Sequence, residues 1–207
     1  MASASNTSVG ELRYRLRCID KLPIRFRGDE RLLDVGCGDG GVARLLRERV
    51  AEVVAVDIEE SEEWQDEPGL TFGVADGERL LFDDASFDLL HSKDSLHHME
   101  NAASALAEYR RVLKPGGVAL IVEGNRFNPS FYLHMTLALG HEHFRQGHFR
   151  QLVRAAFPEA RFGAFEAHYV PGLDRLLPLQ HAVEEGLGRF WPVRRLLSYN
   201  FAIAKLP

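Results

Sequence analysis

The sequence predicts one α/β domain in which a mainly parallel sheet carries helices on both faces. The first observation is the stretch 32–41, where a short apolar strand runs into a turn with four glycines and then into a helical pattern. The second is a pair of apolar runs, 53–57 and 70–76, that each end in an aspartate. The third is size, since 207 residues with 45% hydrophobic and 27% charged side chains suit a single domain with a sizeable core.

Composition excludes several classes of protein. A net charge of −5 gives no general attraction to nucleic acid or to an anionic membrane. Cys18 and Cys37 are the only cysteines, so the chain has neither a disulfide framework nor a cysteine-rich zinc pattern. No apolar run approaches the length of a membrane span, and the N-terminus lacks the apolar core of a signal peptide. We therefore expect a cytoplasmic monomer or homodimer whose partner is a small molecule.

The glycine-rich turn is typical of a site for a nucleotide-like ligand, because it joins a strand to the N-terminus of a helix. Three of its glycines fit the dinucleotide pattern G-x-G-x-x-G, and Asp57 follows where that pattern places its ribose-binding acid. However, Asp34 before the turn and Asp39 inside it would repel a pyrophosphate. A ligand with an ammonium group would be attracted instead. S-adenosylmethionine is such a ligand, and the acids favour it.

Five regions of the chain resemble, in the same order, the motifs of the class I S-adenosylmethionine-dependent methyltransferases of the small-molecule type. They are Asp34-x-Gly36-x-Gly38-x-Gly40, the strand 53–57, the segment 74–77, the strand 87–90 with the loop 96–99, and the turn 111–117. The resemblance extends to residue 123, about three fifths of the chain. It implies a doubly wound, Rossmann-like sheet of seven strands. It also implies S-adenosyl-L-methionine as methyl donor and S-adenosyl-L-homocysteine as product.

The resemblance further implies how the donor is held. Asp34 and the glycine turn would hold the methionine part, and Asp57 would accept hydrogen bonds from both ribose hydroxyls. Asp76 would accept one from the adenine amino group, and Ile58 would pack on the adenine ring. The complete set of predicted donor-binding residues is Asp34, Gly36, Cys37, Gly38, Gly40, Asp57, Ile58, Asp76, Gly77, Ser92 and Lys93.

Periodicity and turn signals supply the other elements of the predicted donor-binding core, residues 9–123. An amphipathic helix over 9–22 ends before Pro23. In related methyltransferases a leading helix often covers the donor, which would bring Tyr14 and Arg17 toward the ligand. The other predicted helices span 40–48, 59–67 and 102–113, and the predicted strands span 31–35, 53–57, 70–75, 86–91 and 118–123.

Residues 124–158 form the predicted helical cap over the acceptor, with helices over 131–139 and 149–157. Four of the nine histidines lie in this insertion. An imidazole can take a proton near neutral pH, so His141 and His143 are candidates for a general base, as is His97 in the loop after the fourth strand. A structural role for these histidines remains the alternative. None of their spacings matches a zinc motif and methyl transfer needs no metal, so we expect no metal site.

The last part of the chain, residues 159–207, contains a predicted strand at 161–168, a broken helix at 172–194 and a final strand at 197–204 beside the fifth. The apolar residues of 124–194 could line an acceptor pocket, form a dimer face or touch lipid. Aromatic residues in the cap favour an apolar or aromatic acceptor, such as a natural product, a quinone-like ring or a lipid-linked sugar, methylated on O, N or C. Two alternatives stay open: a non-catalytic donor-binding protein of the same fold, and an NAD(P)-dependent oxidoreductase.

Overall fold

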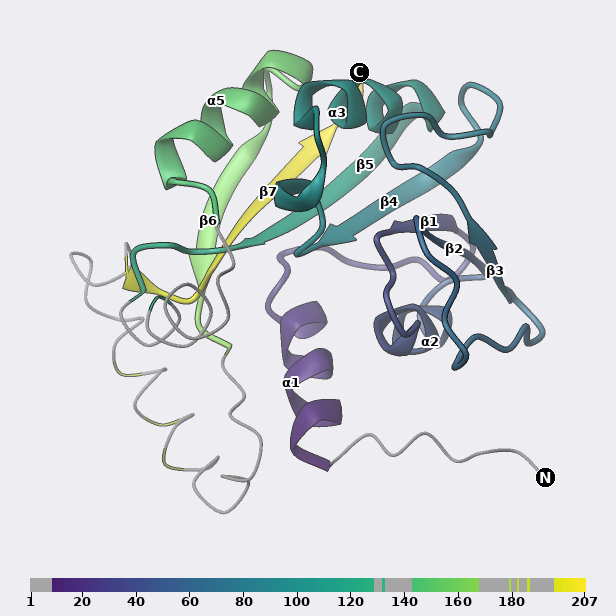
Figure 1. Ribbon diagram of the computed structural model, residues 1–207, viewed down its shortest axis with the longest axis horizontal. Helices are drawn as coiled ribbons and strands as arrows, with labels where there is room; N and C mark the ends of the chain where they lie inside the picture. The colour runs from purple at the N-terminus through teal and green to yellow at the C-terminus, as the bar shows by residue number, and fades with distance from the viewer. Residues whose placement is uncertain are drawn as a thin grey trace.

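The computed structural model describes residues 9–128, 143–167 and 196–207, together with positions 132, 179, 182 and 186. In this part of the chain, strands in the order β3-β2-β1-β4-β5-β7-β6 form one seven-stranded sheet (Figure 1). The strands are β1 (Arg31–Val35), β2 (Glu52–Asp57), β3 (Leu70–Val74), β4 (Phe87–Lys93), β5 (Leu113–Gly124), β6 (Arg161–Phe165) and β7 (Tyr199–Lys205). Strands β1 to β5 pair in parallel, whereas β7 runs antiparallel to both β5 and β6. The predicted seven-stranded, mainly parallel sheet is confirmed.

The register of the parallel strands brings their carboxyl ends to one edge of the sheet. Asp34 on β1 lies opposite Ala55 on β2 and His91 on β4. The next strands continue this alignment, since Asp57 pairs with Val74 of β3. In an open parallel sheet, ligands bind at this edge. The predicted acids at the ends of β1 and β2 therefore lie on neighbouring strands, as expected.

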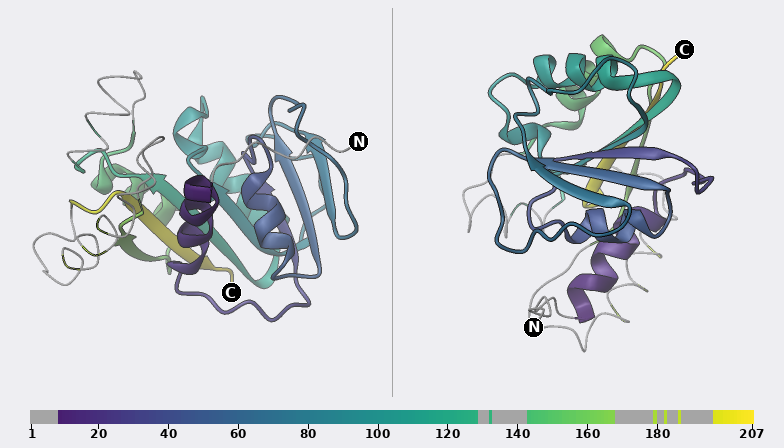
Figure 2. Two further views of the ribbon diagram at one scale, coloured as in Figure 1. Left: turned by 90° about the horizontal axis from the view of Figure 1, so that it is seen from below. Right: turned by 90° about the vertical axis from the view of Figure 1, so that its right-hand side faces the viewer.

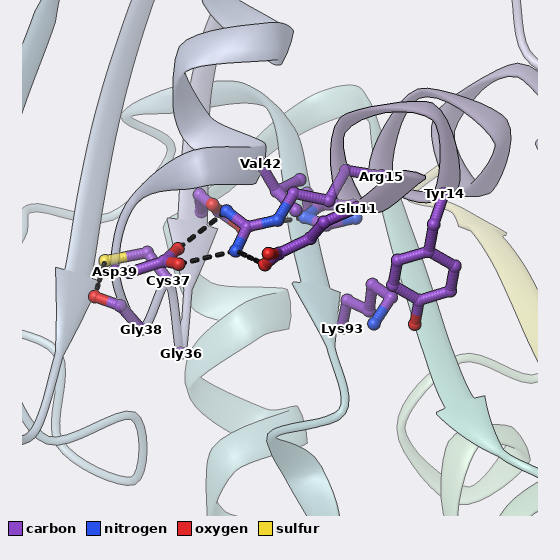
Figure 3. Close-up of a pocket in the computed structure, with 11 residues that line it drawn as sticks. Glu11, Tyr14, Arg15, Gly36, Cys37, Gly38, Asp39, Val42 and Lys93 are labelled. Atoms are coloured by element: carbon purple, nitrogen blue, oxygen red, sulfur yellow. Dashed lines mark hydrogen bonds and ion pairs between the residues drawn. The ribbon is translucent and has the colours of Figure 1, made fainter. Parts of the chain in front are cut away.

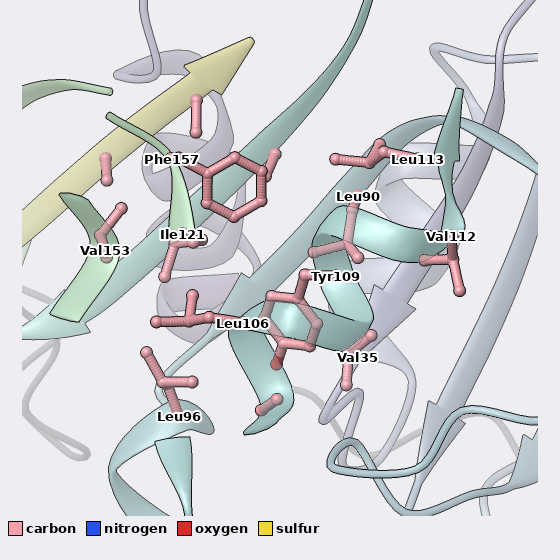
Figure 4. Packing of buried hydrophobic residues seen from close by; sticks show 14 of the residues in the cluster. Val35, Leu90, Leu96, Leu106, Tyr109, Val112, Leu113, Ile121, Val153 and Phe157 are labelled. Atoms are coloured by element: carbon pink, nitrogen blue, oxygen red, sulfur yellow. The ribbon is translucent and has the colours of Figure 1, made fainter. Parts of the chain in front are cut away.

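Helices cover both faces of the sheet (Figures 1 and 2). They are α1 (Val9–Asp20), α2 (Gly41–Arg47), α3 (Ala102–Val112) and α5 (Gln146–Ala156), with a 3₁₀ turn η1 (Leu96–His98) after β4. Helices α1 and α2 lie on one face and α3 and α5 on the other. On the second face, Leu106 and Tyr109 of α3 and Phe149 of α5 are fully buried in one apolar cluster (Figure 4). Burying one such side chain contributes about 1.5–3 kcal/mol, so this packing fixes the loops at the sheet edge.

Several boundaries and one element differ from the sequence-based prediction. Strand β6 ends at Phe165 and not at residue 168, and β7 begins at Tyr199 and not at residue 197. Strand β4 continues to Lys93, so residues 92 and 93 belong to the strand end rather than to the following loop. Strand β5 begins at Leu113, because Leu113 already pairs with Phe87 across a register shift. The predicted helix over 59–67 is wrong: this segment contains a turn, and Trp64 in it is held by tertiary contacts instead. Its indole donates a hydrogen bond to the Gly38 carbonyl at 2.8 Å and stacks on another aromatic ring.

Two predicted segments fall largely outside the described residues, namely the cap helix at 131–139 and the broken helix at 172–194. The second cap helix is α5, which begins three residues earlier than predicted, at Gln146. Within the described ranges, no helix is long and apolar enough to cross a membrane.

Candidate functional site

The glycine turn after β1 brings the backbone to the sheet edge without covering it by side chains. Gly36, Gly38 and Gly40 have φ values of +76°, +54° and +77°, in the left-handed region that favours glycine. A Cβ on Gly36 would lie 2.2 Å from the Cβ of Ser95, so the turn packs directly against the segment that follows β4. Gly40 lies behind the turn, where a Cβ would overlap Phe72. The turn therefore needs glycine both for its conformation and for close packing.

Two cavities meet at this turn. The larger has a volume of about 580 Å³ and is bordered by the ends of β2 and β3 and by the loop after β4. The smaller has a volume of about 210 Å³ and lies between the turn, β4 and helix α1. Gly36 and Gly38 line both. A ligand with two different ends can therefore occupy both cavities and cross the turn between them.

Two of the carboxylates that line the larger cavity lie at the ends of β2 and β3, beside an exposed apolar side chain. Asp57, at the end of β2, accepts hydrogen bonds from the N–H groups of Gly38 at 2.7 Å and Ile58 at 2.8 Å. The side chain of Ile58 is 68% exposed at the mouth of the cavity. Asp76 follows β3 and accepts from the Glu78 N–H at 2.8 Å. This side of the site thus offers acceptor oxygens for hydroxyl and amino groups beside an apolar surface.

Gly77 shapes the floor of the larger cavity. A Cβ on this residue would lie 2.6 Å from the Cε atom of Met99 and 3.1 Å from a methyl carbon of Val35. All three residues line the cavity. A larger residue at position 77 would therefore push Met99 into the space that the ligand needs.

The smaller cavity contains a buried carboxylate with one oxygen left over. Asp34 is 2% exposed, and its Oδ1 atom lies 2.7 Å from Nδ1 of His91. Its Oδ2 atom is buried and has no hydrogen-bond partner within the described part of the chain. A buried charged oxygen without a partner is costly, so this atom calls for a donor from a ligand. Both Asp34 and His91 line the cavity.

Helix α1 closes the smaller cavity with an arginine. The Arg15 guanidinium binds both Asp39 of the glycine turn and Glu11 one helical turn earlier (Figure 3). Burial alone would raise the pKa of Asp39, but the hydrogen bonds from Arg15 and from the Gly41 N–H outweigh it and hold that pKa below its usual range. The ion pair therefore ties α1 to the turn.

Lys93 borders the smaller cavity from the end of β4. Its ammonium binds the Asp94 carboxylate and lies 4.9 Å from the ring centroid of Tyr199. It also lies 5.2 Å from the ring centroid of Tyr14 (Figure 3). Burial alone would lower the pKa of Lys93, but the charge of Asp94 outweighs it and holds the pKa well above its usual value. Lys93 is therefore charged and already paired.

A second acid–imidazole pair lies at the ends of β4 and β5. The Nδ1 atom of His97 is 2.6 Å from Oε2 of Glu123, while Oε1 of Glu123 accepts the Leu96 N–H at 2.9 Å. Burial alone would lower the pKa of His97, but the hydrogen bond and charge of Glu123 outweigh it, so the pKa is raised. For the Glu123 carboxyl, burial is the dominant cause, and it raises the pKa. Within the described chain, Nε2 of His97 is buried and has no hydrogen-bond partner.

Two further imidazoles surround His97. The ring centroids of His98 and His143 lie 4.0 Å and 4.4 Å from that of His97. The structure thus brings together two of the three predicted base candidates, His97 and His143, whereas His141 lies outside the described residues. Among the described residues, no group of three or more potential ligands has the geometry of a metal site.

Comparison with known proteins decides the family. Residues 33–121, which run from β1 to β5 and include the glycine turn, match the family model of the methyltransferase domain. Residues 33–121 therefore form a methyltransferase domain of the class I, S-adenosylmethionine-dependent type. The matched residues contain the glycine turn, strands β2 to β4, and Asp57 and Asp76 of the larger cavity.

Curated relatives match this chain over about half of its length. It is 35% identical over 113 residues to 27-O-demethylrifamycin SV methyltransferase of Amycolatopsis mediterranei, covering 49% of this chain and 42% of that protein. It is 38% identical over 106 residues to a ubiquinone/menaquinone biosynthesis C-methyltransferase of Bordetella avium, covering 46% and 41%. The aligned part thus spans about two fifths of the length of these relatives.

A solved structure confirms the fold over nearly the whole chain. An S-adenosylmethionine-dependent methyltransferase from Archaeoglobus fulgidus superposes with a TM-score of 0.68 at 18% identity, covering 95% of this methyltransferase and 94% of that chain. At this identity the likeness establishes the fold alone. The predicted Rossmann-like methyltransferase fold is confirmed.

The groups of S-adenosylmethionine suit the side chains that line the two cavities. The orphaned oxygen of Asp34 suits an ammonium group, and the oxygens of Asp57 and Asp76 suit hydroxyl and amino groups. Nine of the predicted donor-binding residues line one cavity or both: Asp34, Gly36, Cys37, Gly38, Asp57, Ile58, Asp76, Gly77 and Lys93. Gly40 and Ser92 line neither; Ser92 is buried, and its Oγ lies 2.9 Å from Oγ of Ser95.

Sequence reasoning missed several residues at the site. Glu11 and Arg15 line the smaller cavity beside the expected Tyr14, and the spacing of the three on one helical face was the available signal. Arg17 lines neither cavity; it lines a separate groove with other residues of α1 and Lys21. His91 and Glu123 gave no signal, because each lies inside an apolar strand and acquires its role only through a partner on another segment.

Proposed function

We propose that this protein transfers the methyl group of S-adenosylmethionine to a small apolar or aromatic molecule. The observation that carries the proposal is the distribution of acids along the sheet edge. Asp34 lines the smaller cavity and has one buried oxygen without a hydrogen-bond partner in the described chain, and Asp57 and Asp76 line the larger cavity. These positions match the ammonium, the ribose and the adenine of one donor molecule.

In this arrangement the methionine part occupies the smaller cavity and the adenosine part the larger. The donor molecule crosses from one cavity to the other at Gly36 and Gly38, which line both cavities. The sulfonium group of the bound donor supplies an already activated methyl group. The protein then contributes mainly by holding the acceptor atom in line with that methyl, which is a proximity effect.

His97 is the base that we assign to an acceptor that must lose a proton. Glu123 accepts the Nδ1 proton of His97 and so fixes the tautomer in which Nε2 carries a lone pair. That atom is the part of the ring with no hydrogen-bond partner among the described residues. Nε2 would take the proton from the acceptor, and the acceptor atom would bond to the methyl carbon as the bond between that carbon and the sulfonium sulfur breaks, which releases S-adenosylhomocysteine. His143 packs edge-on beside the base.

The acceptor class follows from the side chains around the base and from the relatives. Phe144 lies with its ring centroid 6.4 Å from that of His97, and Phe127 in the segment after β5 is half-exposed. The relatives named above act, by their names, on a rifamycin and in quinone biosynthesis. An apolar or aromatic natural product or a quinone-like ring is consistent with both.

The first test is calorimetric titration of the purified protein with S-adenosylhomocysteine, and with NADH and NADPH in parallel. We expect binding of S-adenosylhomocysteine alone. Binding of a nicotinamide cofactor instead would overturn the proposal. Acceptors are then screened by mass spectrometry for the gain of one methyl group. Donor binding without turnover on any acceptor class would favour the non-catalytic alternative.

The donor assignment is tested by Asp57→Ala. Loss of its two oxygens removes the acceptors for the ribose hydroxyls, and hydrogen bonds to a charged group contribute about 1.5–3 kcal/mol. We therefore expect affinity for S-adenosylhomocysteine to fall more than tenfold, or about 1.4 kcal/mol. Thermal unfolding of the variant checks that the fold is intact. Unchanged affinity would refute the assignment.

A further inference from the structure

His91 is a buried imidazole that the proposed reaction does not use. It lies on β4 directly opposite Asp34 on β1, and it is 2% exposed. Within the described residues its one hydrogen bond is to Oδ1 of Asp34, at 2.7 Å. It also lines the smaller cavity. A polar ring in an otherwise apolar strand, paired with an acid at the site, calls for an explanation.

The hydrogen bond determines how the carboxylate of Asp34 is oriented. When Nδ1–H donates to Oδ1, the carboxylate plane is fixed and part of the cost of burying its charge is offset. The same hydrogen bond leaves Oδ2 as the oxygen that accepts from the cavity, and that atom has no partner within the described chain. The pair therefore behaves as a preformed acceptor.

The other charged groups that line the smaller cavity already form ion pairs. Arg15 binds Glu11 and Asp39. Lys93 binds Asp94 from the end of β4. Asp34 differs from these acids because its partner is an imidazole rather than a lysine or an arginine. Among the described acids of this cavity, it is the one that an incoming cation can reach without breaking an ion pair with Lys or Arg.

We propose that His91 is a positioning residue that presents Oδ2 of Asp34 to the α-ammonium group of the methyl donor. This inference rests on the proposed function, and it adds a residue and a geometry to it. His91 acts through Asp34: it selects which oxygen faces the cavity and keeps the carboxylate in one rotamer. Donor affinity therefore depends on His91 only for ligands that carry the ammonium group.

The test compares two ligands that differ in this group. S-adenosylhomocysteine carries the α-ammonium, whereas 5′-methylthioadenosine has the same adenosine and thioether but no amino acid part. We expect His91→Phe to weaken binding of S-adenosylhomocysteine about tenfold, because the carboxylate loses a charged hydrogen bond that holds it in place. Affinity for 5′-methylthioadenosine should change less than twofold, which also shows that the variant is folded.

Two further variants separate positioning from general support of the strand. His91→Asn places an amide N–H near the position of Nδ1 and should restore most of the affinity. The double variant His91→Phe with Asp34→Asn should bind S-adenosylhomocysteine no more weakly than Asp34→Asn alone, because His91 acts through Asp34. As a matched control, Leu89→Val alters the same face of β4 two residues earlier. It should lower thermal stability without changing the ratio of the two affinities.

The outcomes divide cleanly. Equal losses for both ligands, additive losses in the double variant, or unchanged affinity in His91→Phe would each overturn the inference while leaving the proposed function intact. If the wild-type protein binds 5′-methylthioadenosine and S-adenosylhomocysteine equally well, the ammonium is not recognised and the inference fails. If it binds neither, the proposed function itself fails.

Discussion

Two buried acid–imidazole pairs lie at the same edge of the sheet. In one pair an oxygen of the acid has no hydrogen-bond partner in the described chain, and in the other a nitrogen of the imidazole has none. In the Asp34–His91 pair, the imidazole contacts one carboxylate oxygen, and the other oxygen is buried without a hydrogen-bond partner in the described chain. In the Glu123–His97 pair, both carboxylate oxygens are occupied and Nε2 of the imidazole is left over. The same contact between Nδ1 and a carboxylate thus yields an anionic acceptor in one place and a base in the other.

The difference arises from a single backbone group. The Leu96 N–H of η1 donates to the second oxygen of Glu123. No corresponding donor reaches the second oxygen of Asp34 in the described chain, because the glycine turn directs its own N–H groups to Val56 and Asp57. Loop conformation therefore decides which member of each pair can interact with a ligand.

The largest expected effect comes from a substitution of His97, the imidazole of the second pair. His97→Gln removes the proton acceptor, and loss of general-base catalysis costs about 10²–10⁴-fold in rate. We expect kcat to fall by at least about 100-fold, while affinity for S-adenosylhomocysteine stays within twofold. Steady-state kinetics and calorimetry on the same preparation measure both. A variant that loses donor affinity but keeps kcat would reverse the roles of the two pairs.

A pH profile tests how the carboxylate acts within the second pair. His97 works as a base only when neutral, and Glu123 raises its pKa above 6.5. The rate should therefore fall as the pH drops through that raised value, which belongs to the coupled pair. Glu123→Gln removes the negative charge beside His97, so the fall of the rate at low pH should move to lower pH. The maximum rate should fall about tenfold or more. A limb that does not move would show that Glu123 has no electrostatic effect on the base.

The smallest expected effect concerns the glycine turn itself. Burial, followed by the charges of Asp34 and Asp57, raises the pKa of the Cys37 thiol, so this cysteine is not a nucleophile at neutral pH. Its contribution to the site is a backbone N–H that donates to Val56. We expect Cys37→Ala to change donor affinity and kcat less than twofold. A larger loss of affinity or kcat, measured in the same assays, would mean that the side chain of Cys37 contacts the donor.

The geometry of the glycine turn and of the two strand-end aspartates could be predicted from the sequence because its determinants are local. The turn is encoded by four glycines within six residues, and Asp57 and Asp76 each lie at the end of a short apolar run that indicates a strand. Position at the end of a parallel strand is enough to place such a side chain at the site. The bounds of β1 were predicted without error for the same reason.

The contacts around His97 and helix α1 could not be predicted from the sequence, because the residues that make them are far apart in the chain. His97 was a candidate, yet its partner Glu123 lies 26 residues later and inside a strand that reads as core. Arg15 was missed in favour of Arg17, since the face of α1 that meets the turn depends on how the helix docks. The wrong helix at 59–67 has a similar cause: the contacts of Trp64 with Gly38 and Phe72 override local preference.

The position of β7 has a consequence for how this molecule is made. Strand β7 is the last strand in the described sequence, but it lies between β5 and β6, and β6 pairs with no other strand in the described sheet. As the chain leaves the ribosome, β1 to β5 can assemble while β6 still has no neighbour. Pairings over such long sequence separations form slowly. The sheet therefore closes only when the C-terminal segment has emerged, and premature termination before Tyr199 would leave two exposed strand edges.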